Sequence, residues 1–294
     1  MNSTSTRYNI DIRAAMDRLK KVVNRTPLTF NQNLSRKYKA NVYLKREDLQ
    51  IVRSYKLRGA YNMMSSLPRE QLERGAVCAS ADNHAQGFAY SCKKLNVKGI
   101  VFMPIVTPNQ KVHQTKMFGE QFIEVVLTGD TFDDCLVAAR QYTIEHNMVF
   151  IPPFDDPKII EGQGTVALEI LEDLSTIDYL FIPVGGGGLA AGVGTYFKTY
   201  SPKTRIIGFE PEGAPSMYEA RKAGHPVTLE NIDRFVDGAS VKRVGELTFS
   251  ICQEVLDDMH LVPEGKVCST ILKLYNEEAI VVEPAGALSI AGLD

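Results

Sequence analysis

A chain of 294 residues is longer than one average domain, so one large or two intermediate domains are expected. Its composition is that of a soluble globular protein, and a net charge of −2 lacks the basic bias of a nucleic-acid or anionic-membrane partner. The five cysteines are scattered and form no Cys-x-x-Cys pair, which predicts reduced thiols rather than disulfides or a zinc site. The N-terminus has no signal-peptide core, and no apolar run reaches the ~20 residues of a membrane span, so a cytoplasmic protein is expected.

Short apolar strands alternate with amphipathic helices along most of the chain. Helical spacing is found at residues 10–23 and 33–39, and a predicted strand follows at 41–48. Further strands are predicted at 76–80, 99–104, 122–127, 148–154, 178–184 and 205–211, and helices at 85–95, 108–118, 131–146 and 159–174. This alternation predicts an α/β fold with parallel sheets that helices cover on both faces. Because no linker interrupts the pattern, a second domain would form by the chain crossing over and returning.

A lysine, Lys56, follows the first of these strands and lies near the start of a helix, in the stretch Ser-Tyr-Lys-Leu-Arg-Gly-Ala (54–60). A lysine side chain is a nucleophile only when it is deprotonated, which burial or a cationic neighbour such as Arg58 favours. Most lysines are solvated surface charges, however, and nothing in the hydrophobic pattern selects Lys56. The residues alone leave both interpretations open.

A polar loop, Ser80 to Gly87, joins one predicted strand to the next helix. Serine, aspartate and asparagine are good helix N-caps, so capping would explain the loop without any function. The unpaired N–H groups of a helix start, with side-chain donors beside them, would equally suit a bound carboxylate. His84 taken alone is more often structural than catalytic, and the spacing does not decide between capping and binding.

A glycine loop follows directly on the apolar strand predicted at 178–184 and opens a helix. It consists of Gly185, Gly186, Gly187, Gly188 and Leu189. Glycines let the backbone approach a ligand closely, and a helix N-terminus offers free N–H groups and a positive dipole end. The loop lacks the Gly-Lys-Ser/Thr of a Walker loop and the spacing of a dinucleotide fingerprint, although Glu210 lies near the distance of that fingerprint's acidic residue. A tight turn needs fewer glycines, so a phosphate site is favoured.

Together these segments resemble the threonine dehydratases (threonine deaminases), a family of fold-type II pyridoxal-phosphate enzymes. The segments that carry the resemblance are VYLKREDLQ (42–50), SYKLRGAYN (54–62), the loop 80–87, GGGGL (185–189), VDGASVKRVG (236–245) and VEPAGALS (282–289). VDGASVKRVG, CQEVLDD (252–258) and VEPAGAL are closer to the biosynthetic branch, which begins isoleucine synthesis, than to the catabolic one. The resemblance covers essentially the whole chain. It implies a lyase that converts L-threonine, with L-serine as a second candidate substrate, to a 2-oxo acid and ammonia by α,β-elimination.

The resemblance also implies a role for each singled-out residue. Lys56 would be the catalytic residue that holds the cofactor as a Schiff base and acts as general base at the substrate Cα. The other implied cofactor contacts are Tyr55 beside the ring, Asn83 to the ring hydroxyl, and Gly185 to Leu189 around the phosphate. The implied contacts to the substrate carboxylate are Ser80, Asn83 and His84.

The family fold implies two α/β domains with the cofactor in the cleft between them. Residues 1–52 and 152–294 would form the larger domain, and 53–151 the smaller one inserted in it. The chain stops at Asp294, where the family continues with a further strand and then a regulatory domain, so we expect a truncated sheet and no isoleucine feedback. The expected partners are an amino-acid substrate and further copies of the chain, with no nucleic acid or membrane.

A few positions depart from the family pattern. Asp82 stands where the family usually has glycine, and we expect it to repel a substrate carboxylate by about 1 kcal/mol at ~4 Å in water and to disfavour a glycine-type backbone angle. Ala81 stands where related serine racemases have a second catalytic serine, which favours elimination over racemisation. A racemase-like enzyme and a cofactor-binding remnant with little activity remain as alternatives. Glu210 and Ala214 match a cation site of relatives, but Ser216 replaces its acidic residue, so no metal is predicted.

Overall fold

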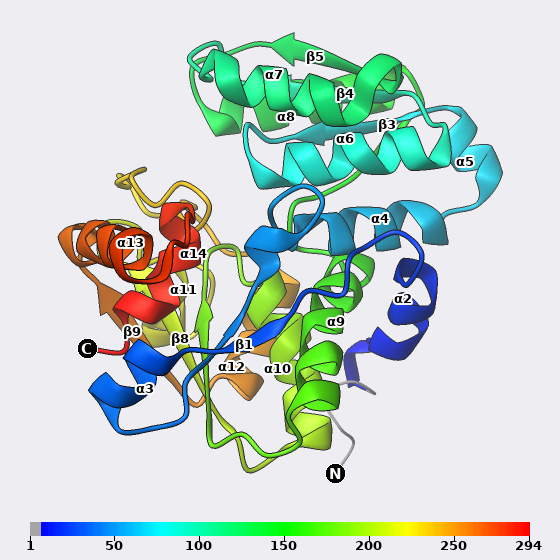
Figure 1. Cartoon of the computed structure of the whole chain (residues 1–294). Coiled ribbons are helices and arrows are strands. Elements are labelled where there is room, and N and C mark those ends of the chain that lie inside the picture. Colours follow the sequence, from blue (N-terminus) through cyan, green and yellow to red (C-terminus); the bar gives the residue numbers. More distant parts are fainter. Residues whose placement is uncertain (1–6) are drawn as a thin grey trace.

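The computed structural model describes residues 7–294, which form an upper and a lower part in the view of Figure 1. The first elements are α2 (Ile12–Leu19), β1 (Leu28–Phe30), α3 (Gln32–Tyr38), β2 (Tyr43–Lys45), the 3₁₀ helix η1 (Glu47–Leu49), α4 (Lys56–Ser66) and α5 (Arg69–Glu73). The upper part continues with β3 (Ala76–Ala79), α6 (Asn83–Leu95), β4 (Gly99–Met103), α7 (Asn109–Gly119), η2 (Glu120–Phe122), β5 (Ile123–Leu127), α8 (Phe132–Glu145) and β6 (Val149–Phe150). The lower part follows with α9 (Pro157–Asp173), β7 (Tyr179–Pro183), α10 (Gly188–Tyr200), β8 (Arg205–Pro211), α11 (Ser216–Ala223), α12 (Glu246–Val255), β9 (Asp258–Val262), α13 (Glu264–Glu278) and α14 (Pro284–Ala291).

The upper part is built on a parallel sheet of four strands in the order β5-β4-β3-β6. Alternate side chains of β3 enter two hydrophobic clusters, Cys78 on the side of α6 and Val77 on the side of α8. Because both faces are covered, β3 and β4 are buried throughout and have continuous apolar sequences. Strand β6 is shorter than the predicted 148–154 because Pro152 has no N–H to donate to the neighbouring strand.

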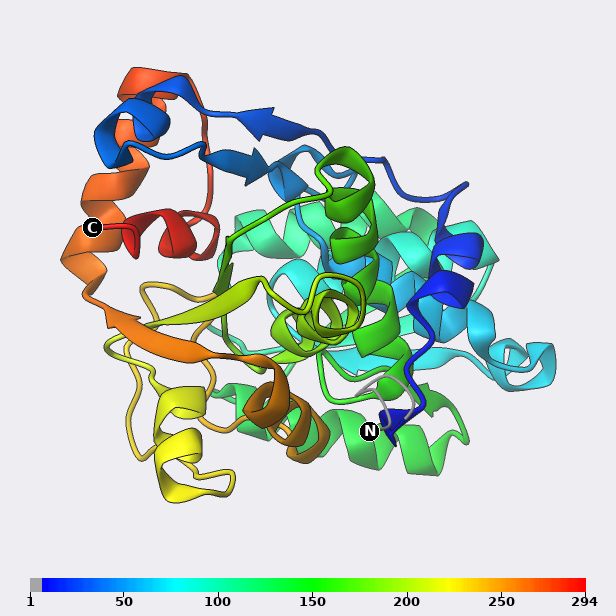
Figure 2. The same ribbon diagram turned by 90° about the horizontal axis from the view of Figure 1, so that it is seen from below.

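The lower part contains a second parallel sheet, in the order β7-β8-β9. Ile206 of β8 packs in a cluster with α9, α10 and α12, whereas Phe209 packs on the other face with α13 and α14. Figure 2 shows this layering, with α13 and α14 at the left-hand edge and α9 and α10 in the middle. Both sheets are therefore parallel and covered by helices on both faces, which confirms the predicted α/β fold.

Two strands are missing from the sequence-based prediction. Strand β1 pairs with β2 in an antiparallel hairpin, with Leu28 opposite Lys45, and β9 pairs with β8 at the edge of the lower sheet. Strand β1 has only three residues, and β9 carries Asp258 and His260 among its five. Neither segment has an extended apolar run, so tertiary pairing rather than local pattern decides both.

Among the helices, α4 lies between the two parts. It packs against α6 of the upper part and α9 of the lower part (Figure 1). The first turn of α4 therefore lies where the two parts meet. Within residues 7–294, no helix is both long enough and apolar enough to cross a membrane.

Candidate functional site

Lys56 is the first residue of α4, at the junction of the two parts. Its Nζ donates a hydrogen bond to the carbonyl oxygen of Pro153, 3.1 Å away, and lies 5.6 Å from the centre of the Tyr55 ring. Burial lowers the pKa of Lys56 to about 8, although the negative charges of Asp82 and Glu283 act in the opposite direction. Far more of this amine is unprotonated near neutral pH than of an ordinary lysine, as a nucleophile or base requires.

The segment that leads from β6 to α9 contacts all three stretches that the sequence singles out. The carbonyl oxygen of Ile151 lies 3.0 Å from Nε2 of His84, and the carbonyl oxygen of Pro153 is the acceptor for the lysine. Phe154 packs against the glycine loop, because a Cβ on Gly186 would lie only 2.3 Å from its ring. One short segment therefore links the lysine, the polar loop and the glycine loop.

The polar loop before α6 packs closely on the start of α4. Asp82 is the N-cap residue of α6, but its side chain caps no N–H of that helix, so side-chain capping does not explain this aspartate. Its backbone N–H donates instead to Oγ of Ser80 at 3.2 Å. A Cβ at Gly87 would lie 2.9 Å from the backbone of Leu57, so only glycine allows this approach of α6 to α4. The free N–H groups at the start of α6, which favour an anion, thereby come close to the first turn of α4.

His84 is buried, and its ring is neutral. Burial, together with the charge of Lys56, lowers the pKa of His84 to about 3. Because a carbonyl oxygen only accepts, Nε2 carries the ring proton and donates to Ile151, and Nδ1 is left as a buried acceptor without a partner. The ring has no donor to spare for a carboxylate. His84 could therefore bind the substrate carboxylate only through its backbone N–H, in the first turn of α6.

The glycine loop joins β7 to α10, as predicted. Gly187 has a φ of +89°, which residues with a side chain rarely adopt, and Gly188 begins the helix. No side chain caps this helix start, so its first N–H groups and its positive dipole end remain available to a phosphate. Thr248 holds the loop in place by donating from its hydroxyl to the carbonyl oxygen of Gly186 at 2.7 Å, and Leu189 packs on the hydrophobic core.

A further loop, in the family segment VDGAS, packs between the glycine loop and α6. A Cβ on Gly185 would lie 2.9 Å from Ala239. A Cβ on Gly238 would lie 3.5 Å from a carboxylate oxygen of Glu283 and 3.8 Å from Nδ2 of Asn83. Four family segments that are far apart in the sequence therefore pack together at the VDGAS loop.

Asn83, the first residue of α6, reaches from the upper part to the lower one. Its Nδ2 donates to both carboxylate oxygens of Glu283, at 2.8 and 2.9 Å. Burial, and then the neighbouring charge of Asp82, raise the pKa of Glu283 to about 7. The amide of Asn83 is thus held by an acidic residue that the sequence prediction did not include.

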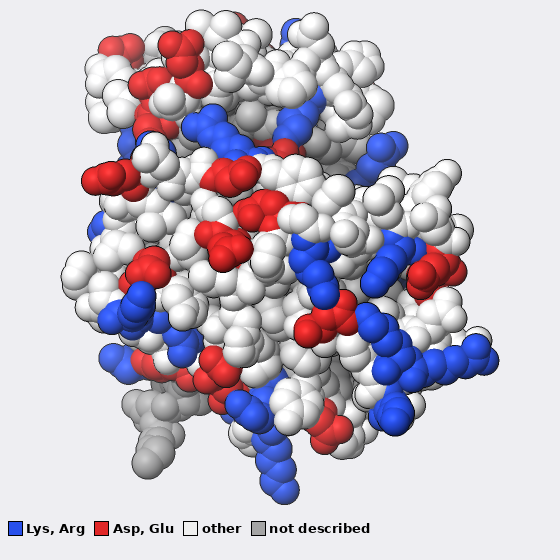
Figure 3. All heavy atoms as spheres, turned by 90° about the vertical axis from the view of Figure 1, so that its left-hand side faces the viewer, with Lys and Arg blue, Asp and Glu red and all other residues white. Residues whose placement is uncertain are grey.

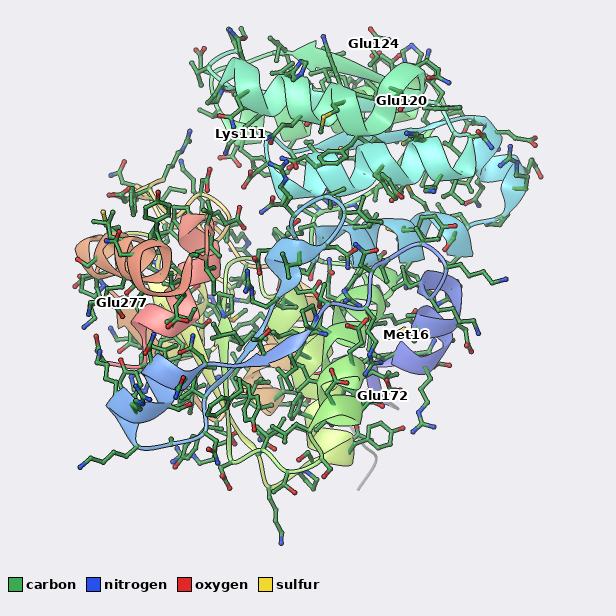
Figure 4. The ribbon with its side chains drawn as sticks, viewed as in Figure 1. Met16, Lys111, Glu120, Glu124, Glu172 and Glu277 are labelled. Carbon is green, nitrogen blue, oxygen red and sulfur yellow. The ribbon has the colours of Figure 1, made fainter. Side chains whose placement is uncertain are left out.

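Lys111 makes a second contact between the two parts. It lies at the start of α7, on the side of the upper part that faces the lower part (Figure 4). Its Nζ is 3.3 Å from Oδ1 of Asp82 and also contacts Oδ2 of Asp237. Burial opposes the charge of Lys111, but these two carboxylates raise its pKa overall. Figure 3 shows acidic and basic side chains gathered along this boundary.

The structure corrects one of the two concerns about Asp82. Its φ of −141° is an ordinary extended value, so the expectation of a disfavoured glycine-type angle is wrong. The electrostatic concern stays a prediction. Burial and Asp237 raise the pKa of Asp82, whereas Lys111 and Lys56 lower it. These two lysines offset part of its negative charge, so repulsion of a bound carboxylate would be reduced but not removed.

Polar atoms without a partner gather near Lys56. Among the described residues they include Oγ of Ser54, Oδ2 of Asp82 and Nδ1 of His84. Buried polar atoms are rarely left unpaired in folded proteins, and such atoms are expected where a ligand or ordered water binds. Together with an amine that loses its proton readily and an uncapped helix start, they fit a phosphorylated aldehyde such as pyridoxal phosphate.

Arg58 does not have the role that its position in the sequence suggested. The low pKa of Lys56 comes from burial and not from Arg58. Arg58 is fully buried, and its guanidinium donates to Glu47 and Glu169 at 2.7 to 2.9 Å. Lys45 donates to the same Glu169 at 2.6 Å. We call Arg58, Lys45, Glu47 and Glu169 the Arg58 network. The network contains two positive and two negative charges, so its net charge is zero.

Glu210 lies near the end of β8, and backbone N–H groups donate to its carboxylate. Its carboxylate accepts from the N–H groups of Met217 and Tyr218 at 2.8 and 2.7 Å, and burial raises its pKa to about 8. Within the part of the chain that the structure describes, no group of three or more His, Cys, Asp or Glu side chains is placed to hold a metal ion. These contacts match the simpler interpretation of Glu210, which closes the strand and the start of α11.

Several residues of this site were not predicted from the sequence, and we single out those that contact the predicted lysine, asparagine and aspartate directly or through Lys111. They are Pro153, Lys111, Asp237 and Glu283. Asp237 and Glu283 lie in the segments VDGAS and VEPAG, whose resemblance to the family marked them without giving a role. Pro153 and Lys111 had no such signal, because a backbone carbonyl and a lysine among many others are common features of any sequence.

Known proteins resemble the chain over nearly its whole length. The family model described as pyridoxal-phosphate dependent enzyme matches residues 19–294. The chain is 60% identical over 285 residues to the biosynthetic L-threonine dehydratase IlvA of Halalkalibacterium halodurans, which covers 97% of this chain and 69% of that protein. The processed form of threonine deaminase isoform 2 from Solanum lycopersicum matches with a TM-score of 0.92 and 46% identity, over 98% of this chain and 82% of that one. Maize serine racemase matches with a TM-score of 0.91 and 30% identity, over 95% and 84% of the two chains.

Proposed function

We propose, since the chain belongs to the family of pyridoxal-phosphate-dependent enzymes, that it is an L-threonine dehydratase of the biosynthetic type. It would convert L-threonine to 2-oxobutanoate and ammonia at the start of isoleucine synthesis, with L-serine as a second candidate substrate. The observation that carries the proposal is Lys56, whose pKa is lowered to about 8 and whose surroundings include unpaired buried polar atoms. A perturbed pKa at such a site is typical of catalytic groups.

The residues that would hold the cofactor come from both parts of the molecule. Lys56 would bind its aldehyde carbon, Tyr55 would lie beside its ring, and Asn83 would contact its ring hydroxyl. The N–H groups from Gly185 to Leu189 would bind its phosphate. When bound, pyridoxal phosphate withdraws electrons from the substrate Cα and so makes the proton on that carbon acidic.

Groups of the chain itself account for proton removal and for carboxylate binding. With its lowered pKa, Lys56 can take the proton from the substrate Cα at Nζ. The N–H groups in the first turn of α6 would hold the substrate carboxylate. The hydroxyl of Ser80 accepts from the N–H of Asp82 and keeps its own proton free to donate to the same carboxylate.

A serine racemase is the main alternative, and Ala81 favours the dehydratase. Racemisation needs a second acid–base group on the face of the substrate opposite the lysine, so that a proton leaves one face and arrives at the other. Ala81 follows Ser80 where that second group would be, and it has no ionisable atom. We therefore expect L-serine that is recovered after incubation to remain the L-form. Chiral chromatography that finds D-serine above the level of a sample without enzyme would contradict this.

The proposal extends to the organisation of the protein. Residues 1–52 and 152–294 would be one domain and 53–151 the other, since each range has its own sheet and core clusters. Exposed apolar side chains would suit contacts in a homo-oligomer, among them Leu272, Tyr275 and Val281. Sedimentation velocity would test the oligomer, and a single monomer peak at assay concentration would contradict it.

The protein would be located in the cytoplasm, consistent with the free thiols of all five cysteines among the described residues.

Absorbance spectra and a keto-acid assay test the proposed activity. The protein saturated with pyridoxal phosphate should show the band of a lysine-bound cofactor and should form 2-oxobutanoate from L-threonine. The variant Lys56→Ala should lose both, whereas Lys203→Ala, at an exposed lysine, should keep both. If no band depends on Lys56, the cofactor assignment is overturned. A band without 2-oxobutanoate would overturn the dehydratase activity alone.

A further inference from the structure

The carboxylate of Glu283 is hydrogen-bonded to one side chain of the candidate site, the amide of Asn83. Glu283 is the N-cap residue of α14, yet its carboxylate caps no N–H of that helix. Both of its oxygens instead accept from Nδ2 of Asn83 at 2.8 and 2.9 Å, across the boundary between the two parts. The carboxylate is thus directed toward the site rather than toward its own helix.

The surroundings of Glu283 make this arrangement costly unless the amide contact stabilises it. The titratable groups that face Glu283 are Asp82, Asp237, Lys111, Lys56 and Tyr55. Burial and the two other carboxylates disfavour its ionised form, whereas the amide of Asn83 and the charge of Lys111 favour it. The hydrogen bond from Asn83 is therefore the direct contact that keeps a carboxylate at this place.

The identity of the acceptor decides how the Asn83 amide is held. Above its pKa of about 7, Glu283 is an ionised carboxylate that only accepts hydrogen bonds, so it selects the nitrogen end of the amide and excludes the reversed orientation. A glutamine in its place could donate to Oδ1 as well as accept from Nδ2, and it would select neither end. The charge of Glu283 therefore fixes one orientation of Asn83.

We propose that Glu283 is a positioning residue, which fixes the Asn83 amide against the ring oxygen of the bound cofactor. This inference rests on the proposed function, in which Asn83 contacts that oxygen. The negative charge on the far side of the amide makes the ring oxygen less able to carry a negative charge of its own. Glu283 thereby controls the proton that the ring oxygen and the lysine nitrogen share, without touching either atom.

A pH titration of the absorbance of the lysine-bound cofactor tests this role. Glu283→Gln should lower the midpoint of that titration by about one pH unit, the size expected for one hydrogen bond to a charged group. Glu283→Asp keeps the charge and should restore part of the shift. Asp237→Asn removes a nearby carboxylate that does not contact Asn83, and it should shift the midpoint much less.

The Asn83→Ala background separates positioning from a general effect of charge. If Glu283 acts through Asn83, Glu283→Gln should leave the midpoint unchanged when it is combined with Asn83→Ala. An equal shift in both backgrounds, or no shift in either, overturns the inference while the proposed function stands. If the unaltered protein shows no lysine-bound band, the proposed function and this inference are overturned together.

Discussion

The first turn of α4 carries two basic residues, two positions apart, in opposite surroundings. Arg58 has no exposed surface, and its guanidinium donates to Glu47 and Glu169. Burial alone would lower the pKa of Arg58, but these two carboxylates raise it overall. Lys56 donates to one neutral carbonyl group, and burial lowers its pKa to about 8. The same helix turn therefore carries one permanently charged residue and one that can readily lose its proton.

Arg58 is placed to stabilise the fold, whereas Lys56 is placed for chemistry. In the Arg58 network every charge has an opposite charge in contact, so removal of one member leaves a buried charge behind. Around Lys56 the acidic side chains lie nearby without forming an ion pair with it, and some polar atoms have no partner. A site with unpaired groups is less stable than it could be, and those groups remain free to bind a ligand.

The largest expected effect is on activity. Lys56→Ala should reduce kcat/KM for L-threonine by about 10⁴-fold, the upper range for loss of a general base, because Lys56 is the residue proposed to hold the cofactor and to take the proton from Cα. The same variant should not lower the free energy of unfolding of the cofactor-free protein at pH 7, as measured by urea denaturation, because it removes an amine whose charged form burial disfavours. A strong loss of stability in Lys56→Ala would remove the contrast with Arg58.

The next largest effect is on stability. Arg58→Met should lower the free energy of unfolding by about 3–5 kcal/mol, because Glu47 and Glu169 lose their main partner. The matched control is Arg69→Met, at an exposed arginine paired with Glu73, where about 0.5 kcal/mol or less is expected. Equal urea midpoints for these two variants would show that the Arg58 network does not stabilise the fold.

The pH dependence of stability sharpens the contrast at Lys56. Between about pH 8 and the ordinary lysine pKa of about 10.4, the unfolded chain binds a proton at this residue that the folded protein has lost. The free energy of unfolding therefore rises with pH across that window. Below about pH 8 the full cost of burying the charged amine of Lys56 is present. In the cofactor-free protein, the difference in melting temperature between Lys56→Met and the unaltered chain should shrink as the pH rises through this window. A difference that is independent of pH would contradict the lowered pKa.

The smallest expected effect concerns Asp82 and its partner Lys111. Asp82→Gly should raise kcat/KM for L-threonine about fivefold, because about 1 kcal/mol of repulsion with the substrate carboxylate is removed. Lys111→Met should lower kcat/KM when Asp82 is present and should have little effect when Asp82 is replaced by glycine. This double-mutant cycle measures how far the lysine offsets the aspartate. If Asp82→Gly leaves kcat/KM unchanged, the repulsion is negligible.

The sequence by itself determined the main architecture and the kind of site. Strands such as 76–79 and 99–103 are buried on both faces, so their apolar runs could be recognised without knowledge of their neighbours. The glycine loop likewise predicted a strand–loop–helix, because its backbone requirement is local. Lys56 could be identified only through the family resemblance, since its own surroundings are not visible in the pattern.

Only the tertiary structure decided the partners of the singled-out residues. Lys56 donates to Pro153, 97 positions along the chain, and Asn83 donates to Glu283, 200 positions away. The structure likewise showed that Arg58 binds Glu47 and Glu169 rather than acting on its neighbour Lys56. Periodicity reports which face of an element is buried, whereas a pKa depends on distances and burial that are set after the chain has folded. For that reason the sequence could suggest Lys56, and the fold was needed to show why its amine can lose a proton.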